Sequence, residues 1–282
     1  MTNILLALVK KMYHQYRWLN YNYGDFNRPV KRKEVNVYYF KRGDNIDNVG
    51  DLLSPVIVDF MKDRHGVANA KLKSTRRLFA IGSIIDMAKS KMVVWGSGLR
   101  NFHSLPPEYP LDVRAVRGPA TRKKLLDQGV SCPEVYGDPA LLLPLFYDQA
   151  VTKRKEYIIV THYSKEKFIP AAYQTNVVTT LTSDWRSFID SIREAEFVLC
   201  GSLHALIIAE AYGIPALLIQ SEIDKDLFKY EDYYLSTNRP KYQIAATIDQ
   251  ALQQRNFNDG IKNVDEIQNN LIRSFPVDLW KA

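Results

Sequence analysis

From about residue 34 onwards, short runs of apolar, often β-branched residues alternate with amphipathic segments. This alternation is typical of parallel strands that are connected by helices covering the sheet. It predicts strands at residues 35–40, 92–95, 113–116, 134–136, 157–161, 177–180, 197–200 and 216–220. It predicts helices at residues 52–63, 119–128, 184–195, 203–212 and 264–275. The chain is therefore expected to have an α/β fold.

A polar stretch at residues 145–156 interrupts the alternation before a new strand begins at residue 157. The length of 282 residues allows two lobes that each bury a core. We therefore expect two Rossmann-like lobes that face a cleft. The expected segments are a basic, aromatic N-terminal segment (1–34), an N-terminal lobe (35–148), a C-terminal lobe (149–262) and a C-terminal helix (263–282) that packs on either lobe.

The composition, 46% hydrophobic and 24% charged, is that of a soluble globular protein. The two cysteines, Cys132 and Cys200, lie far apart in the sequence without a partnering His pattern, so they suggest neither a zinc site nor a disulfide framework. This cysteine content fits a protein of the reducing cytoplasm. No His and carboxylate cluster suggests a metal, so we expect neither metal nor cofactor. The apolar run at residues 4–9 is far shorter than the roughly 20 residues of a spanning helix.

The formal net charge is +7, and part of it lies in the first 35 residues, where Lys, Arg, Tyr and Trp are frequent. This segment either touches the anionic inner face of the plasma membrane peripherally or forms a surface helix packed on the domain. Nucleic acid is not expected as a partner, because no recognisable nucleic-acid-binding module is present.

The most informative stretch is residues 197–219, which read FVLCGSLHALIIAEAYGIPALLI. A buried strand leads into Ser202, which is placed to cap a helix starting at Leu203, and Gly213 ends that helix. His204 then lies in the first helical turn at the carboxyl edge of the sheet, where free backbone N–H groups favour anions. A His at this point either exchanges a proton beside a bound anion or simply packs in the fold.

This stretch resembles the signature of the polysaccharide pyruvyl transferase family, in which a Leu-His pair opens a helix. Further matches occur in the same order along the chain, and together they cover roughly residues 36–240. They are Asn48-Val49-Gly50-Asp51, Gly82-Ser83, Gly96-Ser97-Gly98, Arg117-Gly118, Gly137-Asp138-Pro139-Ala140, Asp224-Lys225 and the run from Lys229 to Tyr234.

The resemblance implies a fold like that of two-lobed B-type glycosyltransferases. It also implies transfer of pyruvate from phosphoenolpyruvate, as a ketal, to a sugar of a surface polysaccharide or a lipid-linked oligosaccharide precursor. His204 would be the catalytic acid or base. The residues expected to bind the substrates are His162, Tyr163, Ser202, Leu203, Lys225, Arg117, Asp51 and Gly50.

Two positions depart from the pattern of many relatives. Ser202 stands where an Arg is common two positions before the His, and His162 stands where an Arg often follows the first strand of the second lobe. The departures give more importance to Lys225 and Arg117 as cations for the donor. The alternatives are that Lys225 is a solvated surface residue and that Arg117 is a structural ion-pair partner.

Two carboxylates have expected structural roles. Asp51 is placed to cap Leu52, although its loop also suits a sugar acceptor, and Asp138 is placed to cap a helix that begins at Pro139. Two other functions stay open for the whole chain. One is a glycosyltransferase that uses a nucleotide-sugar on the same scaffold, and the other is a non-catalytic glycan-binding component of polysaccharide assembly.

Overall fold

The computed structural model describes residues 37–42, 46–71, 76–106, 110–223 and 226–280. These residues belong to the compact unit Val35–Ala282. The basic segment at residues 1–34, with its alternative roles at a membrane or on the protein surface, lies outside the described residues, as does Lys225. In the part of the chain that is described, no helix combines the length and the apolar character needed to cross a membrane.

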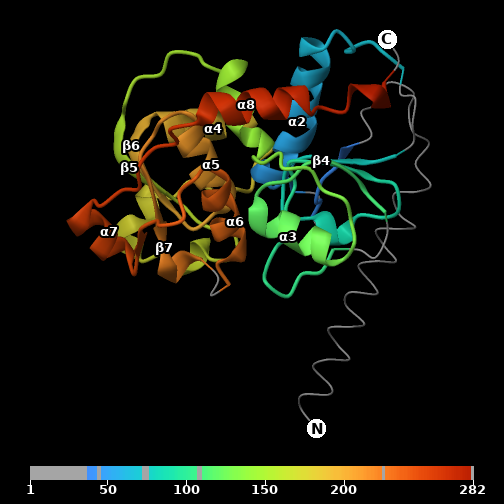
Figure 1. The fold of residues 1–282 in the computed structure, drawn as a ribbon. Coiled ribbons are helices and arrows are strands. Elements are labelled where there is room, and N and C mark those ends of the chain that lie inside the picture. The colour runs from blue at the N-terminus through green and yellow to red at the C-terminus, as the bar shows by residue number, and fades with distance from the viewer. Residues whose placement is uncertain (1–36, 43–45, 72–75, 107–109, 224–225, 281–282) are drawn as a thin grey trace. The chain divides into compact units, whose positions relative to one another are not determined.

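Two parallel β-sheets form the framework of this unit (Figure 1). The first sheet has the order β1 (Val37–Tyr38), β2 (Leu78–Phe79), β3 (Val93–Trp95) and β4 (Asp112–Ala115). The second has the order β5 (Lys155–Val160), β6 (Ala195–Cys200), β7 (Ala216–Ile219) and β8 (Ile244–Ala245). The expected α/β class is confirmed, and the two sheets are compatible with Rossmann-like lobes.

Seven α-helices are described. They are α2 (Val49–Arg64), α3 (Pro119–Asp127), α4 (Trp185–Arg193), α5 (Leu203–Ala211), α6 (Phe228–Ser236), α7 (Ile248–Gln254) and α8 (Val264–Arg273). Of these, α2, α3, α4, α5 and α8 begin and end close to the predicted positions. Short 3-10 helices are η1 (Ile85–Met87), η2 (Pro139–Leu145), η3 (Glu166–Phe168), η4 (Ala171–Asn176), η5 (Gln220–Glu222) and η6 (Val277–Leu279). Helices α6 and α7 and the two-residue strands β2 and β8 had not been predicted.

Two of the predicted strands are wrong. Residues 134–136 and 177–180 form only the isolated bridges Val116 to Tyr136 and Ile159 to Val177. After Tyr136 the chain turns at Gly137, with φ +139°, and Asp138 starts η2 as expected, its carboxylate accepting the Ala140 N–H at 2.9 Å. After Val177 the chain crosses to the other lobe, where Leu181 bridges Asn48. Both segments leave the sheet too soon to form a ladder.

The order of the second sheet reverses at β5. Val177 bridges β5 on one side, whereas β6, which comes later in the chain, pairs with it on the other side. In open α/β sheets such a reversal opens a crevice at the carboxyl end of the central strand, and ligands bind there. Residues that follow Val160 and Cys200, which are paired at the ends of β5 and β6, therefore lie at this crevice.

One hydrophobic cluster runs through both lobes and includes Trp95 from the first sheet and Val198 from the second. Helix α5 lies in this cluster, and every residue from Ala205 to Glu210 is buried. A helix that is apolar on all sides must be surrounded by protein. The lobes thus share a core, and this fixes the start of α5 relative to the first lobe.

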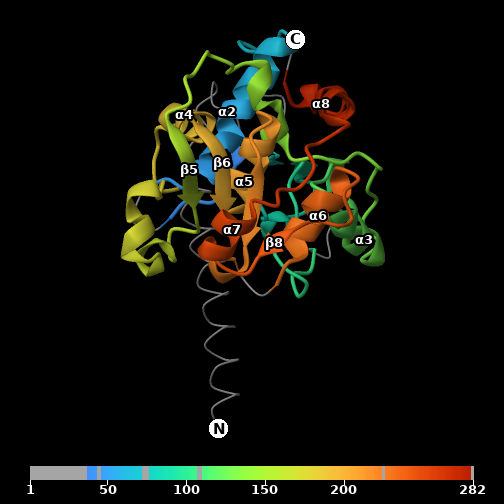
Figure 2. The same cartoon turned by 90° about the vertical axis from the view of Figure 1, so that its left-hand side faces the viewer.

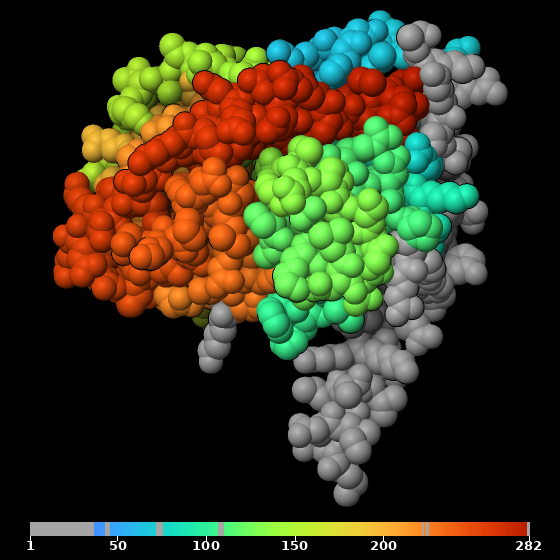
Figure 3. Space-filling model, viewed as in Figure 1, coloured from blue at the N-terminus to red at the C-terminus, as the bar shows by residue number. Residues whose placement is uncertain are grey.

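The C-terminal helix packs on the first lobe. The Gln268 side chain donates to the Leu141 carbonyl at 2.7 Å, and the Trp95 indole N–H donates to the Leu271 carbonyl at 2.9 Å. Figure 3 shows α8 and the following residues as a red band that continues from the second lobe across the upper side of the first. The helix therefore ties the two lobes together behind the crevice.

Candidate functional site

The carboxyl edges of the two sheets meet in direct contacts between the lobes. The Arg42 guanidinium, after β1, lies 4.1 Å from the ring centre of Tyr163, after β5. The Phe102 N–H, after β3, donates to the Asp226 carboxylate, after β7, at 2.9 Å. Because loops at both carboxyl edges touch, the crevice at β5 is closed on its other side by the first lobe.

His204 lies where helix α5 meets the first turn of helix α2. A methyl group at Gly50 would come within 2.1 Å of the His204 Nδ1 atom, so only glycine leaves room for the ring. Asn48 caps α2 through the Gly50 N–H at 3.1 Å and thus fixes this turn. The His204 Nε2 atom is buried and has no hydrogen-bond partner among the described residues. A buried polar atom without a partner is costly unless a ligand satisfies it.

The surroundings of His204 strongly favour its neutral form. Burial, together with smaller effects of the positive charges of Arg117 and Lys229, lowers the pKa of His204 to about 3. An imidazole in this state has one ring nitrogen free to accept a proton at neutral pH. A bound anion would offset the two cations and make that protonation easier.

Asp51, the neighbour of Gly50, is shifted in the opposite direction. Burial raises the pKa of Asp51 to about 7, against an opposing effect of the Arg100 charge. The carboxylate lies beside Gly82, where an added methyl group would be 3.4 Å from Oδ1. The expected capping role of Asp51 is wrong, because α2 begins at Val49 and Asn48 occupies the cap. Two titratable groups with pKa values moved apart are the usual arrangement of an acid and base pair.

The first turn of α5 offers free backbone donors. Ser202 occupies the cap position, but its side chain makes no cap hydrogen bond, contrary to our expectation. Within the described part of the chain, no acceptor is found for the backbone N–H groups of Leu203, His204 and Ala205. Unsatisfied N–H groups at a helix start favour an anion, and here they adjoin the unpartnered His204 Nε2.

Arg117 is buried and fully engaged rather than facing the crevice. Its side chain is 1% exposed and forms an ion pair with Asp232 at 3.1 Å. Its other N–H groups donate to the Ser83 hydroxyl at 2.6 Å and to the Leu99 carbonyl at 2.7 Å. A methyl group at Gly98 would lie 2.4 Å from the guanidinium carbon. These contacts favour the ion-pair alternative for Arg117 over direct binding of the donor.

Helix α6 joins the lobes beside the site, next to α3 in Figures 1 and 2. Its residue Asp232 also accepts the backbone N–H and the hydroxyl of Thr121 in α3, at 2.8 and 2.7 Å. The Tyr230 hydroxyl donates to the Gly201 carbonyl just before α5, at 3.3 Å. The run from Lys229 to Tyr234 matches a motif of the family, but the sequence alone assigns no role to Asp232 or Lys229.

His162 and Tyr163 follow β5 at the mouth of the crevice. The exposed His162 ring packs on Tyr163 with a centroid distance of 4.1 Å, and its Nδ1 atom lies 2.7 Å from the Ser164 hydroxyl. Since Val160 and Cys200 are paired, His162 and Ser202 come two positions after neighbouring strand ends. The structure thus brings these residues to the same edge as His204, with Tyr163 also touching the first lobe.

Two cations complete the site, Arg100 near Asp51 and Lys229 near His204. Arg100 had not been singled out, because its motif, Gly96-Ser97-Gly98, ends two positions earlier and carries no charge. In the described segments no three His, Cys, Asp or Glu side chains gather in a way that would hold a metal ion.

The two parallel sheets, the unpaired N–H groups at the start of α5 and the nearby charges of Arg100 and Lys229 define a two-lobed α/β protein with a candidate site for an anionic ligand beside a neutral His. The model of the polysaccharide pyruvyl transferase family matches residues 7–222, and the chain belongs to that family. The resemblance seen in the sequence is therefore confirmed, and the protein is a pyruvyl transferase of polysaccharide biosynthesis that acts on a glycan.

Other comparisons are less informative. No curated protein matches the chain. A solved structure of a functionally uncharacterised protein from Klebsiella pneumoniae subsp. pneumoniae is 14% identical, covers 77% of this chain and 96% of its own, and gives a TM-score of 0.46.

Proposed function

We propose that this enzyme transfers pyruvate from phosphoenolpyruvate to two hydroxyls of one sugar, forming a ketal on a surface polysaccharide or a lipid-linked oligosaccharide precursor. Its place would be the cytoplasm, and its two lobes would form a fold like that of B-type glycosyltransferases. The observation that carries the proposal is the buried, unpartnered His204 Nε2 beside uncapped N–H groups of α5.

The donor has two anionic groups, a phosphate and a carboxylate, that need cations and N–H donors. The N–H groups of Leu203 and His204 would bind one of them, with Ser202 at the edge. Many relatives have an Arg at the position of Ser202. In this protein Arg100 and Lys229, whose charges act on Asp51 and His204, would supply that positive charge instead. Lys225 remains a further candidate for binding the donor. Arg117 would contribute indirectly, by fixing the position of the Ser83 hydroxyl through a hydrogen bond.

The pKa shifts support a division of proton-transfer roles. Neutral His204 would take the proton of the first sugar hydroxyl as its oxygen bonds to the enol carbon. Asp51, a carboxyl group with a pKa of about 7, would give a proton to the methylene carbon, which becomes the methyl group. The carbon–oxygen bond to phosphate then breaks, the second hydroxyl bonds to the same carbon, and its proton leaves with the phosphate, while the proton on His204 returns to Asp51. The products are the ketal and inorganic phosphate.

The acceptor would enter from the side of His162 and Tyr163. The Arg42 guanidinium and the His162 ring both pack on the Tyr163 ring, so the outer face of the exposed His162 ring would contact the apolar face of a sugar. Gly50 would contribute by letting the His204 ring approach the first turn of α2. The proposed reaction uses phosphoenolpyruvate as the donor substrate and no cofactor.

The test is incubation with phosphoenolpyruvate and a panel of glycans, followed by phosphate assay and detection of the ketal methyl signal by NMR. We expect turnover with the native protein and its loss in His204→Ala, with the fold of the variant retained as checked by circular dichroism. Near-native turnover of His204→Ala would overturn the assignment. Tight glycan binding without turnover for any acceptor would favour a non-catalytic component, and turnover of a nucleotide-sugar would favour a glycosyltransferase.

Lys225 needs its own variant. If it binds the donor, Lys225→Ala should raise the KM for phosphoenolpyruvate with little change in kcat. An unchanged KM would return Lys225 to the solvated surface.

A further inference from the structure

A cavity away from the His204 site lies in the C-terminal lobe, between the loop after α6 and the loop after α7. Its volume is about 590 Å³, and it is lined by residues 237–243 and by residues of the segment 256–263. Pockets that bind small molecules or short oligomers commonly have volumes of about 300–1,000 Å³. The cavity is therefore large enough to hold a short segment of a glycan.

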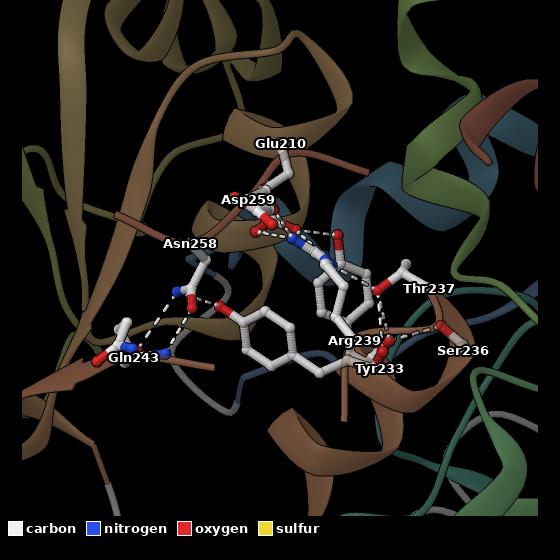
Figure 4. Close-up of polar contacts among 9 residues, drawn as sticks. Glu210, Tyr233, Ser236, Thr237, Arg239, Gln243, Asn258 and Asp259 are labelled. Atoms are coloured by element: carbon white, nitrogen blue, oxygen red, sulfur yellow. Dashed lines mark hydrogen bonds and ion pairs between the residues drawn. The ribbon is translucent and has the colours of Figure 1, made fainter. Parts of the chain in front are cut away.

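The walls of this cavity are fixed by hydrogen bonds that Figure 4 shows together. The Arg239 guanidinium binds both carboxylate oxygens of Glu210, at 2.8 and 2.6 Å, and also donates to the Asp259 carbonyl at 2.7 Å. The Tyr233 hydroxyl donates to the same Glu210 carboxylate at 2.6 Å. Because Arg239 and Asp259 come from the two loops, this network holds the loops at a set distance.

Asn258 makes a second link between the loops. Its carboxamide oxygen accepts the Gln243 N–H, and its NH₂ group donates to the Tyr234 hydroxyl at 3.1 Å and lies 3.3 Å from the Gln243 carbonyl. The Tyr234 and Tyr242 rings stack at 4.1 Å behind these contacts. A cavity whose walls are already ordered loses little entropy when it binds a ligand.

The groups left at the surface of the cavity suit a hydroxylated ligand with negative charge. Amide side chains, each of which both donates and accepts, line it at Asn238, Gln243, Asn256 and Asn263. Sugar hydroxyls also donate and accept, so they match amides better than an apolar ligand would. Two lysines, Lys241 and Lys262, and one acidic residue, Asp259, are in the lining. Lys262 lies 4.0 Å from the Asp259 carboxylate and Arg239 is neutralised by Glu210, so the charge of Lys241 is in excess.

This cavity is separate from the His204 site. Helix α5 begins at the carboxyl edge of the sheet with His204 and ends near Glu210, which is part of the cavity network. Six residues of helix correspond to about 9 Å along the axis. Residues 237–243 also precede β8, which is parallel to β7, and so they approach the opposite edge of the sheet.

We propose that this cavity is a second glycan-binding site that takes an acidic oligosaccharide segment of the acceptor, away from the sugar that is modified. The proposal rests on the proposed function in naming the acceptor as its ligand. Binding a polymer at a second site keeps its other sugars at high effective concentration near the catalytic crevice.

The test measures binding without turnover, so it remains informative even if the proposed reaction is wrong. Two probes are titrated into the full chain, oligogalacturonate as an acidic oligosaccharide and a malto-oligosaccharide as a neutral one. Calorimetry measures the affinity of each. We expect the acidic probe to bind, and Lys241→Glu and Asn256→Ala each to weaken it by about tenfold or more, a loss that corresponds to about 1.4 kcal/mol. Neither side chain holds the walls together, and both residues are exposed.

The matched control is Lys155→Glu, which makes the same change of charge on β5, at the other end of the strand order. Its affinity for the acidic probe should equal that of the native protein, and so should the affinity of His204→Ala. Three results would overturn the proposal: no binding of either probe, unchanged binding in both cavity variants, or loss of binding in His204→Ala. Equal weakening by Lys155→Glu would show a general charge effect and would also overturn it.

Discussion

The guanidinium of Arg117 in the first lobe and the carboxylate of Asp232 in the second form a buried ion pair at 3.1 Å beside the candidate active site. The pair fixes α6 against α3 and thereby sets the position of Lys229 relative to His204. A methyl group at Gly118 would come within 1.9 Å of the Asp232 carbonyl oxygen, so the helix backbone itself lies against the first lobe. The contact between the lobes at this point therefore depends on both Arg117 and Asp232.

Removal of one partner should therefore destabilise the fold. Asp232→Asn is expected to lower the free energy of unfolding by about 3–5 kcal/mol, because it leaves a buried charge without its counter-ion. Chemical denaturation measures this loss. In the Asp232→Asn background, Arg117→Met should cost much less than in the native chain. Additive losses from the two substitutions would contradict the pairing.

Gly50→Ala should disable the enzyme through His204. The added methyl group would come within 2.1 Å of Nδ1 and displace the ring, and a misplacement of about 1 Å can reduce catalysis by about a hundredfold. Phosphate release measures the effect. Gly66→Ala, just after the same helix, is the control, because nothing lies within 4 Å of a methyl group there. Its φ of +68° makes the substitution cost some stability, but its activity should be unchanged. Similar activities for the two variants would contradict the close approach at Gly50.

The pH dependence of stability should contain two opposing contributions. The pKa of His204 is lowered to about 3, so its contribution is lost as the pH falls from about 6.5 towards 3. The pKa of Asp51 is raised to about 7, so its contribution is present at acidic pH and is lost as the pH rises from about 4 towards 7. Between these limits the two effects offset one another.

Single variants separate the two contributions. Relative to the native chain, His204→Gln should lose stability more steeply as the pH rises from about 4 to 6.5, whereas Asp51→Asn should gain stability over the same range. Denaturation at several pH values gives both slopes. Parallel curves for the native chain and both variants would show that these pKa shifts are absent.

Arg100→Ala tests the cation that sequence reasoning missed. Loss of a charged hydrogen-bond donor weakens binding by about 1.5–3 kcal/mol, so the KM for phosphoenolpyruvate should rise by about tenfold or more. The pKa of Asp51 should also rise, because Arg100 lowers it, and the pH profile of kcat/KM would shift upwards. Arg154→Ala, at an exposed position on the second lobe, should change neither quantity. A lower kcat with an unchanged KM would assign Arg100 another role.

The sequence by itself determined what local patterns control. Apolar periodicity predicted the α/β class and five helices, and Asp138, Pro139 and Gly213 marked where segments begin or end, because capping and left-handed turns depend on a few adjacent residues. The ordered motifs identified the family. The strands β2 and β8 have only two residues each, which is too short for a recognisable alternation of apolar and polar positions. Residues 134–136 and 177–180 have the composition of strands but form only isolated bridges with a neighbouring strand.

Only the tertiary structure decided how the candidate site is made. Arg117 and Asp232 are 115 positions apart, so nothing in either neighbourhood could pair them. The close approach of His204 to Gly50 depends on how α5 is buried between the lobes. Burial then moves the pKa values of His204 and Asp51 in opposite directions, because a low-dielectric surrounding penalises whichever form is charged. Residue types and spacing set the available groups, and long-range packing gave each of them its charge state and its neighbours.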